Sequence, residues 1–207
     1  MSGAKNLVIL GAGGQAKVVI TTARLCGYDP VAIYDDDESK IGLDFAGVPV
    51  AGRIVDLPDD FDKSAFIAIG SNLVRKKISQ RLQKAAWVSF IHPTAFVCAT
   101  ARIGHGTIIC AGARIMVEAD IGNQVIVNTG ANIDHECRVG DYVHICPGCN
   151  LAGAVELEEG CFIGTGASII PLKKIGAWAV VGAGAVVTKN VPENVTVVGV
   201  PARILKK

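Results

Sequence analysis

A histidine flanked by two carboxylates stands near the middle of the chain. Residues 126–137 read IVNTGANIDHEC, with His135 between Asp134 and Glu136. Histidine exchanges a proton near neutral pH, and an adjacent carboxylate can fix its tautomer and raise its basicity. These residues therefore suit general-base chemistry. From the residues alone, a solvated histidine on a polar turn is the alternative.

A glycine-rich turn in the N-terminal third suits phosphate binding. The apolar run 7–10 leads into Gly11, Gly13 and Ala16 with the spacing GxGxxA, and acidic residues follow at 35–37. Glycines let a phosphate approach the backbone, and a helix N-terminus attracts anions. The segment is long enough for one mononucleotide-binding half, so it predicts a nucleotide site. A turn that only joins a strand to a helix is the alternative.

The elements around this turn predict a small parallel α/β unit, because short apolar runs alternate with helical patterns. We expect strands at 7–10, 31–34 and 64–69, and helices at 17–26 and 72–86. In the second helix, Arg75, Lys76 and Lys77 are expected to form a basic surface.

The remainder of the chain is an internal repeat. From Ile91 to Val187 every sixth residue is aliphatic, and the residue four places after each is nearly always small, with Lys173 as the exception. A period of six fits neither a helix nor a long flat strand. It predicts short strands separated by bends, stacked as coils of a parallel β-helix with one large and one small side chain directed inward.

Composition excludes several classes of protein. Lysine plus arginine (20) nearly balances aspartate plus glutamate (19), which argues against a nucleic-acid-binding surface. No apolar run has the length that a bilayer requires, and the N-terminus resembles a strand and turn more than a signal peptide. We therefore expect a cytoplasmic protein with no membrane partner.

The seven cysteines are expected to be reduced thiols. Cys146 and Cys149 form a CxxC pair, but a structural zinc site would need a second pair at a suitable spacing. Cys137, Cys149 and Cys161 fall in the column of small inward residues. Their predicted role is therefore to fill the core.

Four segments together carry a family resemblance: GAGGQAKVV, IYDDD, FIAIG and the six-residue repeat, which contains IDHEC. The chain resembles the hexapeptide-repeat sugar acetyltransferases, a family that includes bacillosamine and perosamine N-acetyltransferases and sialic acid O-acetyltransferases. The resemblance implies a Rossmann-like half domain at 1–88, a left-handed parallel β-helix at 89–192 and a C-terminal tail at 193–207. It also implies a homotrimer with active sites between subunits.

The activity implied by the resemblance is acetyl-CoA-dependent N-acetylation, without a metal, of the 4-amino group of a nucleotide-linked amino-deoxy sugar in bacterial glycan biosynthesis. Acetylation of GDP-perosamine, or O-acetylation of sialic acid, is the alternative on the same scaffold. A zinc enzyme of the γ-carbonic anhydrase type is a more distant one. It would need three convergent histidines, and His135 and His144 lack a suitable third.

The resemblance also assigns site residues. It implies His135 as the base, Glu136 as its orienting carboxylate, with Asp134 as competitor, and the Gly153 N–H as the oxyanion donor. The residues expected at acetyl-CoA are His144, Gly153, Thr165 and Ala183. Those expected at the nucleotide sugar are Gly13, Gly14, Gln15, Asp35, Asp36 and Gly70. Gln15 is a departure, because some members of the family have histidine there.

Overall fold

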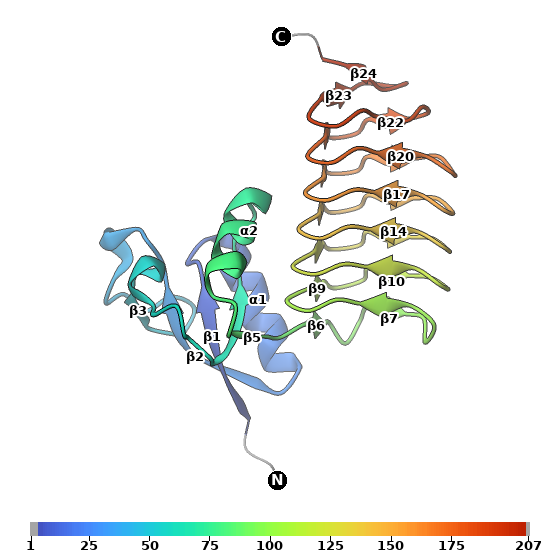
Figure 1. Ribbon diagram of the computed structural model, residues 1–207. Helices are drawn as coiled ribbons and strands as arrows, with labels where there is room; N and C mark the ends of the chain where they lie inside the picture. Colours follow the sequence, from blue (N-terminus) through green and yellow to red (C-terminus); the bar gives the residue numbers. More distant parts are fainter. Residues whose placement is uncertain (1–3, 206–207) are drawn as a thin grey trace. The chain divides into compact units, whose positions relative to one another are not determined.

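The computed structural model describes residues 4–205, which divide into two compact units between Ile91 and His92 (Figure 1). The first unit is a parallel sheet with two main helices. The second is a prism of stacked coils. Each is described separately below.

The first unit has the strand order β3-β2-β1-β4-β5, with every pair parallel. Parallel pairing brings the carboxyl ends of the strands to one edge, where ligands bind in open α/β sheets. The strands are β1 (Lys5–Leu10), β2 (Tyr28–Tyr34), β3 (Val50–Gly52), β4 (Ser64–Ile67) and β5 (Ala86–Trp87), and β6 (Phe90–Ile91) ends the unit. The helices are α1 (Gly14–Leu25) and α2 (Asn72–Arg81), with short 3-10 helices η1 (Glu38–Lys40) and η2 (Ile54–Asp56).

Several bounds differ from the sequence-based expectations. Helix α1 begins at Gly14, before 17, and β2 begins at Tyr28, before 31. Helix α2 ends at Arg81 where 86 was expected, because Leu82 leaves the helical conformation (ψ 58°) and is fully buried. The expected basic surface is also wrong at Arg75, which is only 1% exposed.

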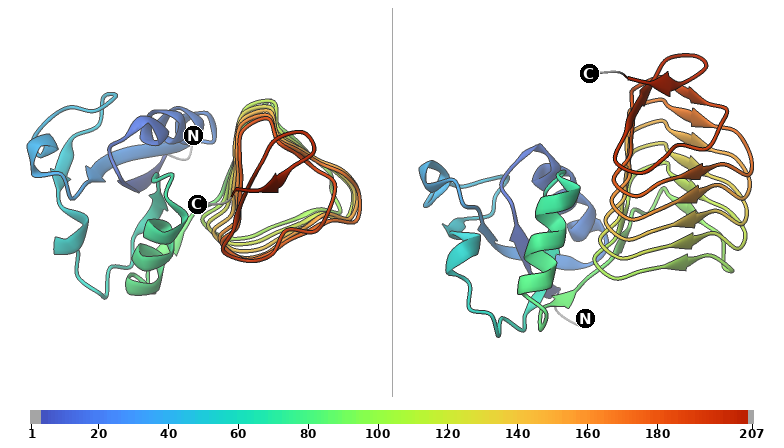
Figure 2. Two further views of the ribbon diagram at one scale, coloured as in Figure 1. Left: turned by 90° about the horizontal axis from the view of Figure 1, so that it is seen from above. Right: turned by 45° about the horizontal axis from the view of Figure 1, so that its top comes forward.

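The second unit is a triangular prism made mostly of two-residue strands (Figure 2). Through most of the prism, each strand pairs in parallel with the strand eighteen residues on, as Asn132 does with Asn150. Near the C-terminal end the spacing is sixteen residues, as between Val180 and Thr196. The first face contains β7 (Phe96–Val97), β10 (Arg114–Ile115), β13 (Asn132–Ile133), β16 (Asn150–Leu151), β19 (Ser168–Ile169) and β22 (Val186–Val187). The second contains β8 (Arg102–Ile103), β11 (Asp120–Ile121), β14 (Arg138–Val139), β17 (Glu156–Leu157) and β20 (Lys174–Ile175). The third contains β9 (Ile108–Ile109), β12 (Ile126–Val127), β15 (His144–Ile145), β18 (Phe162–Ile163), β21 (Val180–Val181) and β23 (Thr196–Val198), and β24 (Arg203–Ile204) pairs antiparallel with β23.

The prism interior confirms the six-residue repeat. Aliphatic residues of the large column, such as Ile133 and Ile163, are fully buried, and so are Cys137, Cys149 and Cys161 of the small column. The seven cysteines are free thiols. Burial raises the pKa of the Cys161 thiol to about 12, so this sulfur is held as an unreactive thiol within the core.

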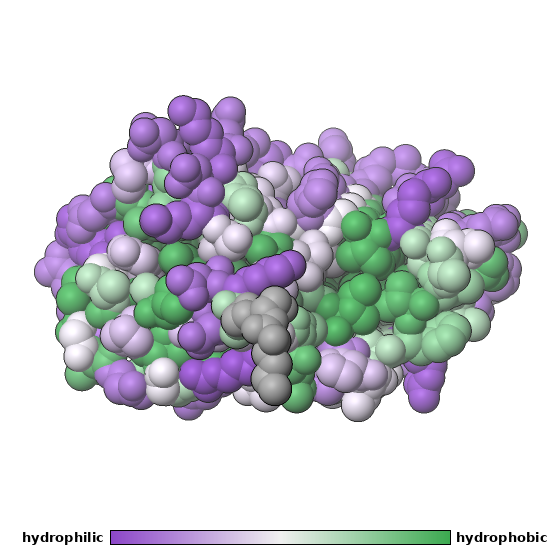
Figure 3. Space-filling view, turned by 90° about the horizontal axis from the view of Figure 1, so that it is seen from below, coloured by the Kyte–Doolittle hydropathy of each residue, from purple (hydrophilic) through white to green (hydrophobic). Residues whose placement is uncertain are grey.

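The ends of the prism differ from its middle. Val97 and Ile103 of the first coil are only partly buried, because a coil covers them on one side only. Hydrophobic side chains gather on this end (Figure 3). The prediction that the column begins inward at Ile91 is wrong, since this residue is 43% exposed. At the other end, the antiparallel pair formed by Val197 and Ile204 closes the stack, while Lys206 and Lys207 lie outside the described residues.

Candidate active site

His135 lies at the corner between the first and second faces of the prism, between β13 and β14. Its side chain is half exposed, and its Nδ1 atom is 3.0 Å from Oε2 of Glu136. A carboxylate only accepts hydrogen bonds, so in the neutral ring Nδ1 carries the proton and Nε2 is left as the acceptor. This is the tautomer that a base acting through Nε2 requires.

The other flanking carboxylate has a different task. Oδ1 of Asp134 accepts a hydrogen bond of 2.8 Å from the backbone N–H of His135. It therefore holds the turn, whereas Glu136 contacts the imidazole ring. The sequence left open which of the two faces the ring, and the geometry favours Glu136.

Gly153 lies one coil further along the same corner, directly against the imidazole. A Cβ atom on Gly153 would come within 2.4 Å of Cε1 and 2.5 Å of Nε2 of His135. The neighbouring N–H of Ala154 donates to the His135 carbonyl at 2.9 Å and ties the two coils together. Gly153 is a buried residue, and among the described residues its N–H donates no hydrogen bond. A backbone N–H without an acceptor in the protein is available to donate to a ligand oxygen.

The corner that carries His135 turns through left-handed backbone positions. Its left-handed positions are occupied by residues with side chains: Glu118, Glu136, Ala154 and Leu172. The corner between the third and first faces uses glycine instead, as at Gly148 and Gly166. A side chain in this region costs roughly 1–2 kcal/mol. Because neighbouring coils share the conformation, it is a property of the corner and not of the His135 turn alone.

A groove with a volume of about 550 Å³ runs along the first face of the prism. It is lined by Asn132, Asp134, Asn150, Ala152 and Ile170, among others. Nδ2 of Asn132 donates to Oδ1 of Asn150 at 2.8 Å. The groove has the volume of a small-molecule site, and its lining includes Asp134, the residue directly before the candidate base.

Three of the residues expected at acetyl-CoA lie elsewhere on the prism. His144 is nearly buried on the third face, edge-on to the Phe162 ring at 5.2 Å. Thr165 and Ala183 lie one coil apart at the corner between the third and first faces, where Gly184 N–H donates to the Thr165 carbonyl at 2.8 Å. Within a single chain, Thr165 and Ala183 are therefore on a different corner from His135 and Gly153, and His144 is on the third face.

The glycine turn of the first unit lies between β1 and α1. Gly11 has φ +106°, and a Cβ there would come within 2.5 Å of the Ile69 side chain, so the turn requires glycine. Gly13 and Gly14 are exposed, with open space where a Cβ would be. Gly13 caps α1 without a side-chain hydrogen bond. The start of α1 is therefore accessible at Gly13 and Gly14, and a helix N-terminus attracts anions.

The two aspartates after β2 are already engaged with the backbone. Asp35 accepts hydrogen bonds from the N–H groups of Ala12 (2.6 Å) and Asp37 (2.9 Å) and from Lys40. Burial raises the pKa of Asp35, but these hydrogen bonds outweigh it and leave the pKa below its usual range. Asp36 accepts from the N–H of Val55 at 2.9 Å. Both carboxylates therefore shape this edge of the sheet.

Gln15 and Gly70 complete the set of residues expected at the nucleotide. Nε2 of Gln15 is buried and has no hydrogen-bond partner among the described residues. The carbonyl of Gly70 accepts a 3.0 Å hydrogen bond from Arg75, which also donates to Asn72. Sequence reasoning did not identify Arg75 as a support of this edge. The available signal in the sequence was a cationic residue in the first turn of a helix that follows a turn predicted to bind the nucleotide.

No helix within residues 4–205 is long and apolar enough to cross a bilayer. Over the same residues, no three His, Cys, Asp or Glu side chains are grouped to hold a metal ion.

Comparisons with known sequences follow the two units. Residues 6–82 match the PglD N-terminal domain family. The UDP-N-acetylbacillosamine N-acetyltransferase of Bacillus subtilis is 42% identical over 114 residues, which cover 52% of each chain. A serine acetyltransferase of Buchnera aphidicola is 32% identical over 139 residues, or 66% of this chain and 46% of that protein. The chain thus spans about half the length of the curated relatives that it matches.

Similar solved structures extend over nearly the whole chain. A histidine-to-asparagine variant of the perosamine N-acetyltransferase from Caulobacter crescentus, in complex with CoA and GDP-perosamine, has a TM-score of 0.92 and 40% identity, with 98% of this chain and 97% of that chain covered. The acetyltransferase domain of PglB from Neisseria gonorrhoeae, in complex with acetyl coenzyme A, has a TM-score of 0.89 and 33% identity, with 98% and 100% covered. The chain therefore belongs to the hexapeptide-repeat acetyltransferases with a PglD-type N-terminal domain and a left-handed β-helix.

Proposed function

We propose that the protein is an acetyl-CoA-dependent N-acetyltransferase that acts on the 4-amino group of a nucleotide-linked amino-deoxy sugar. The observation that carries the proposal is the arrangement of His135 between the Glu136 carboxylate and Gly153. Relatives named for N-acetylation of UDP- and GDP-linked sugars support the reaction class.

His135 is the general base of this reaction. The amine nitrogen attacks the carbonyl carbon of the acetyl thioester, the C–S bond breaks, and CoA leaves as a thiolate. The proton lost by the nitrogen passes to Nε2 of His135 and then to the thiolate sulfur. Glu136 stabilises the imidazolium that forms, because its carboxylate is 3.0 Å from Nδ1. The Gly153 N–H binds the oxyanion of the tetrahedral intermediate.

The glycine turn binds the nucleotide portion of the sugar substrate. The diphosphate of this substrate lies at the start of α1, where Gly13 and Gly14 leave open space. Asp35 and Asp36 fix the adjoining loops, and Gln15 Nε2 donates to the substrate. The two units thereby divide the work: the first selects the sugar carrier, and the prism performs acetyl transfer.

The complete site forms between subunits of a homotrimer. His135 and Gly153 occupy one corner of the prism, while Thr165 and Ala183 occupy another, so a second copy is needed to bring both sets to one acetyl-CoA. The second face is suited to solvent exposure, because its outward residues alternate in charge along the stack. These residues are Arg102, Asp120, Arg138, Glu156 and Lys174. We propose that the grooved first face meets a neighbouring subunit. Seven free cysteines are consistent with the cytoplasm.

A product assay by mass spectrometry tests the proposed reaction. The protein is incubated with acetyl-CoA and, separately, with a UDP-linked 4-amino sugar, GDP-perosamine, CMP-sialic acid or free sialic acid. An acetyl mass gain on one of the amino sugars is expected. Gain only on a sialic acid would replace N-acetylation with O-acetylation, and no gain on any acceptor would count against the proposal.

His135→Ala in the same assay should lower turnover by roughly 10²–10⁴-fold, the usual contribution of a general base. The matched control is His105→Ala. His105 is also exposed and also lies two residues after an inward aliphatic residue, but at the corner between the second and third faces. Equal losses in the two variants would remove His135 from the role of base.

A further inference from the structure

The segment that follows β3 lies at the ligand-binding edge of the first unit. The N–H of Asp35 donates to the Gly52 carbonyl at 3.0 Å, which joins the ends of β2 and β3. The chain then turns into η2, whose Val55 N–H donates to Asp36. Thus η2 is bonded directly to one of the two aspartates at the proposed nucleotide site.

This segment is anchored at both ends and exposed between them. Ile54 and Leu57 are buried at 3% and 7% exposure, whereas Val55 is 55% exposed. The exposed Val55 side chain, between two buried neighbours, is therefore available to contact a ligand bound at this edge of the sheet. Its position depends on the groups that hold the backbone of η2.

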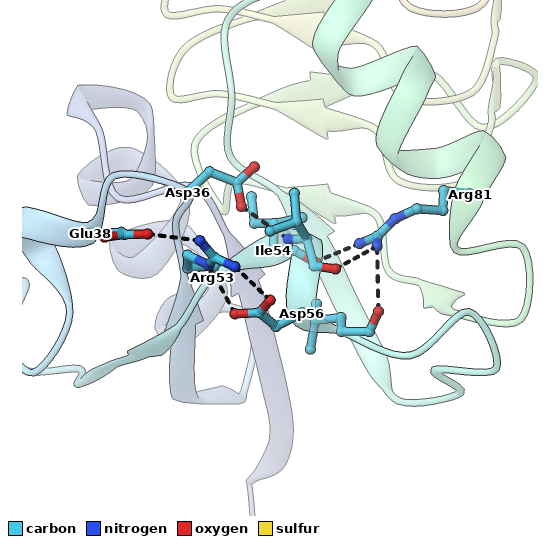
Figure 4. Close-up of polar contacts among 8 residues, drawn as sticks. Asp36, Glu38, Arg53, Ile54, Asp56 and Arg81 are labelled. Atoms are coloured by element: carbon cyan, nitrogen blue, oxygen red, sulfur yellow. Dashed lines mark hydrogen bonds and ion pairs between the residues drawn. The ribbon is translucent and has the colours of Figure 1, made fainter.

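Arg81, the last residue of α2, fixes the backbone of η2 through side-chain hydrogen bonds (Figure 4). Its guanidinium donates to the carbonyls of Ile54, Val55 (3.0 Å) and Leu57 (3.4 Å). The fixed fork of a guanidinium allows one side chain to satisfy several carbonyls at once, which a lysine ammonium does less well. The donor comes from a residue more than twenty positions away, so it ties η2 to α2.

Arg53 acts differently in the same region. It pairs with Asp56 (2.9 Å) and Glu38 (2.7 Å), but both partners are largely exposed (Figure 4). Exposed ion pairs contribute little to stability. Arg81 instead binds main-chain carbonyls, and it is the cation whose loss would free the backbone of η2.

We propose that Arg81 is a positioning residue for the nucleotide sugar. Through the carbonyls of Ile54, Val55 and Leu57, its guanidinium fixes η2 as one wall of the nucleotide site. This wall is far from the glycine turn in sequence but lies at the same edge of the sheet. Arg81 itself does not touch the ligand; it acts through η2 and Asp36. The inference rests on the proposed function, since it assumes that this edge binds the nucleotide.

Nucleotide affinity measured by isothermal titration calorimetry tests the inference. UDP, GDP and CoA are titrated into the full chain, and KM for each substrate is measured where turnover is found. Arg81→Ala should weaken binding of the preferred nucleotide, and raise KM of the nucleotide sugar, roughly tenfold, because hydrogen bonds from a charged group are among the stronger ones. CoA affinity and kcat should stay within about twofold, since the prism is unchanged.

Two further variants separate positioning from general stability. Arg81→Lys should recover part of the affinity, because the ammonium can still donate to a carbonyl. Lys77→Ala removes an exposed cation from the same helix and should leave all three affinities unchanged. Urea unfolding of each variant reports stability separately.

The outcomes distinguish the inference from the function on which it rests. Unchanged nucleotide affinity in Arg81→Ala, or equal weakening of nucleotide and CoA binding, would overturn the role of Arg81 while leaving the acetyltransferase intact. Failure of the wild-type chain to bind UDP or GDP would overturn the nucleotide site itself. Selective loss in Arg81→Ala with partial rescue in Arg81→Lys would support the inference.

Discussion

Glu136 and Glu118 occupy equivalent positions on neighbouring coils, with φ of 59° and 58°, but only Glu136 follows a histidine. Glu136→Gln keeps the shape of the side chain and removes the charge that stabilises the imidazolium. Its kcat should fall by roughly 10–10²-fold, with the melting temperature nearly unchanged. Glu118→Gln is the matched control, and steady-state kinetics should show no loss. Similar kinetics for the two variants would argue against a catalytic carboxylate at 136.

Gly153 offers a second test of single-residue geometry. Its φ is not in the left-handed region, so alanine is allowed by the backbone, but the new Cβ must displace the His135 ring. Gly153→Ala should lower kcat by roughly tenfold or more while costing little stability, because an exposed side chain can swing away. In a His135→Ala background the same change should add no further loss, since the displaced group is gone. Additive losses would mean that Gly153→Ala acts elsewhere.

At the scale of elements, Asp35 links the glycine turn before α1 to the end of β2. Its pKa is lower in the folded state, so its stabilising effect is present above the unfolded pKa and is lost as pH falls through the folded value. Asp35→Asn should therefore lower the free energy of unfolding at pH 7 by roughly 1–3 kcal/mol. The difference from wild type should shrink below about pH 4, near the unfolded pKa of aspartate.

Chemical denaturation of the two proteins between pH 7 and pH 3 measures this difference. Asp29→Asn is the matched control, because Asp29 is an exposed aspartate in the same strand, β2. A constant gap between wild type and Asp35→Asn across the whole range would show that the carboxylate charge contributes nothing.

At the scale of the whole molecule, the two corners of the prism predict complementation between subunits. His135→Ala and Ala183→Trp should each be inactive alone, the first without its base and the second with its acetyl-CoA corner filled. Refolded together in equal amounts, they should regain about one quarter of the wild-type activity, the share of intact interfaces in randomly mixed trimers. Activity assays on the mixture, alongside sedimentation of each variant, provide the measurement. No recovery in mixed oligomers would mean that each site is built within one subunit.

The sequence by itself determined the β-helix, because a strict period of six is a local pattern that dictates which side chains face inward in every coil. It also predicted the parallel α/β unit and the residues of the glycine turn. The element bounds were less accurate: α2 ends five residues earlier than expected, where Leu82 turns into the core.

Only the tertiary structure decided which groups meet. Asp134 and Glu136 are equally close to His135 in sequence, and the left-handed backbone at Glu136 brings its carboxylate to the ring. Arginine is usually exposed at the surface, yet Arg75 is buried beneath the turn after β4. Arg81 supports η2 from a distant part of the chain. Such contacts arise from packing between segments far apart in sequence, and no local periodicity encodes them.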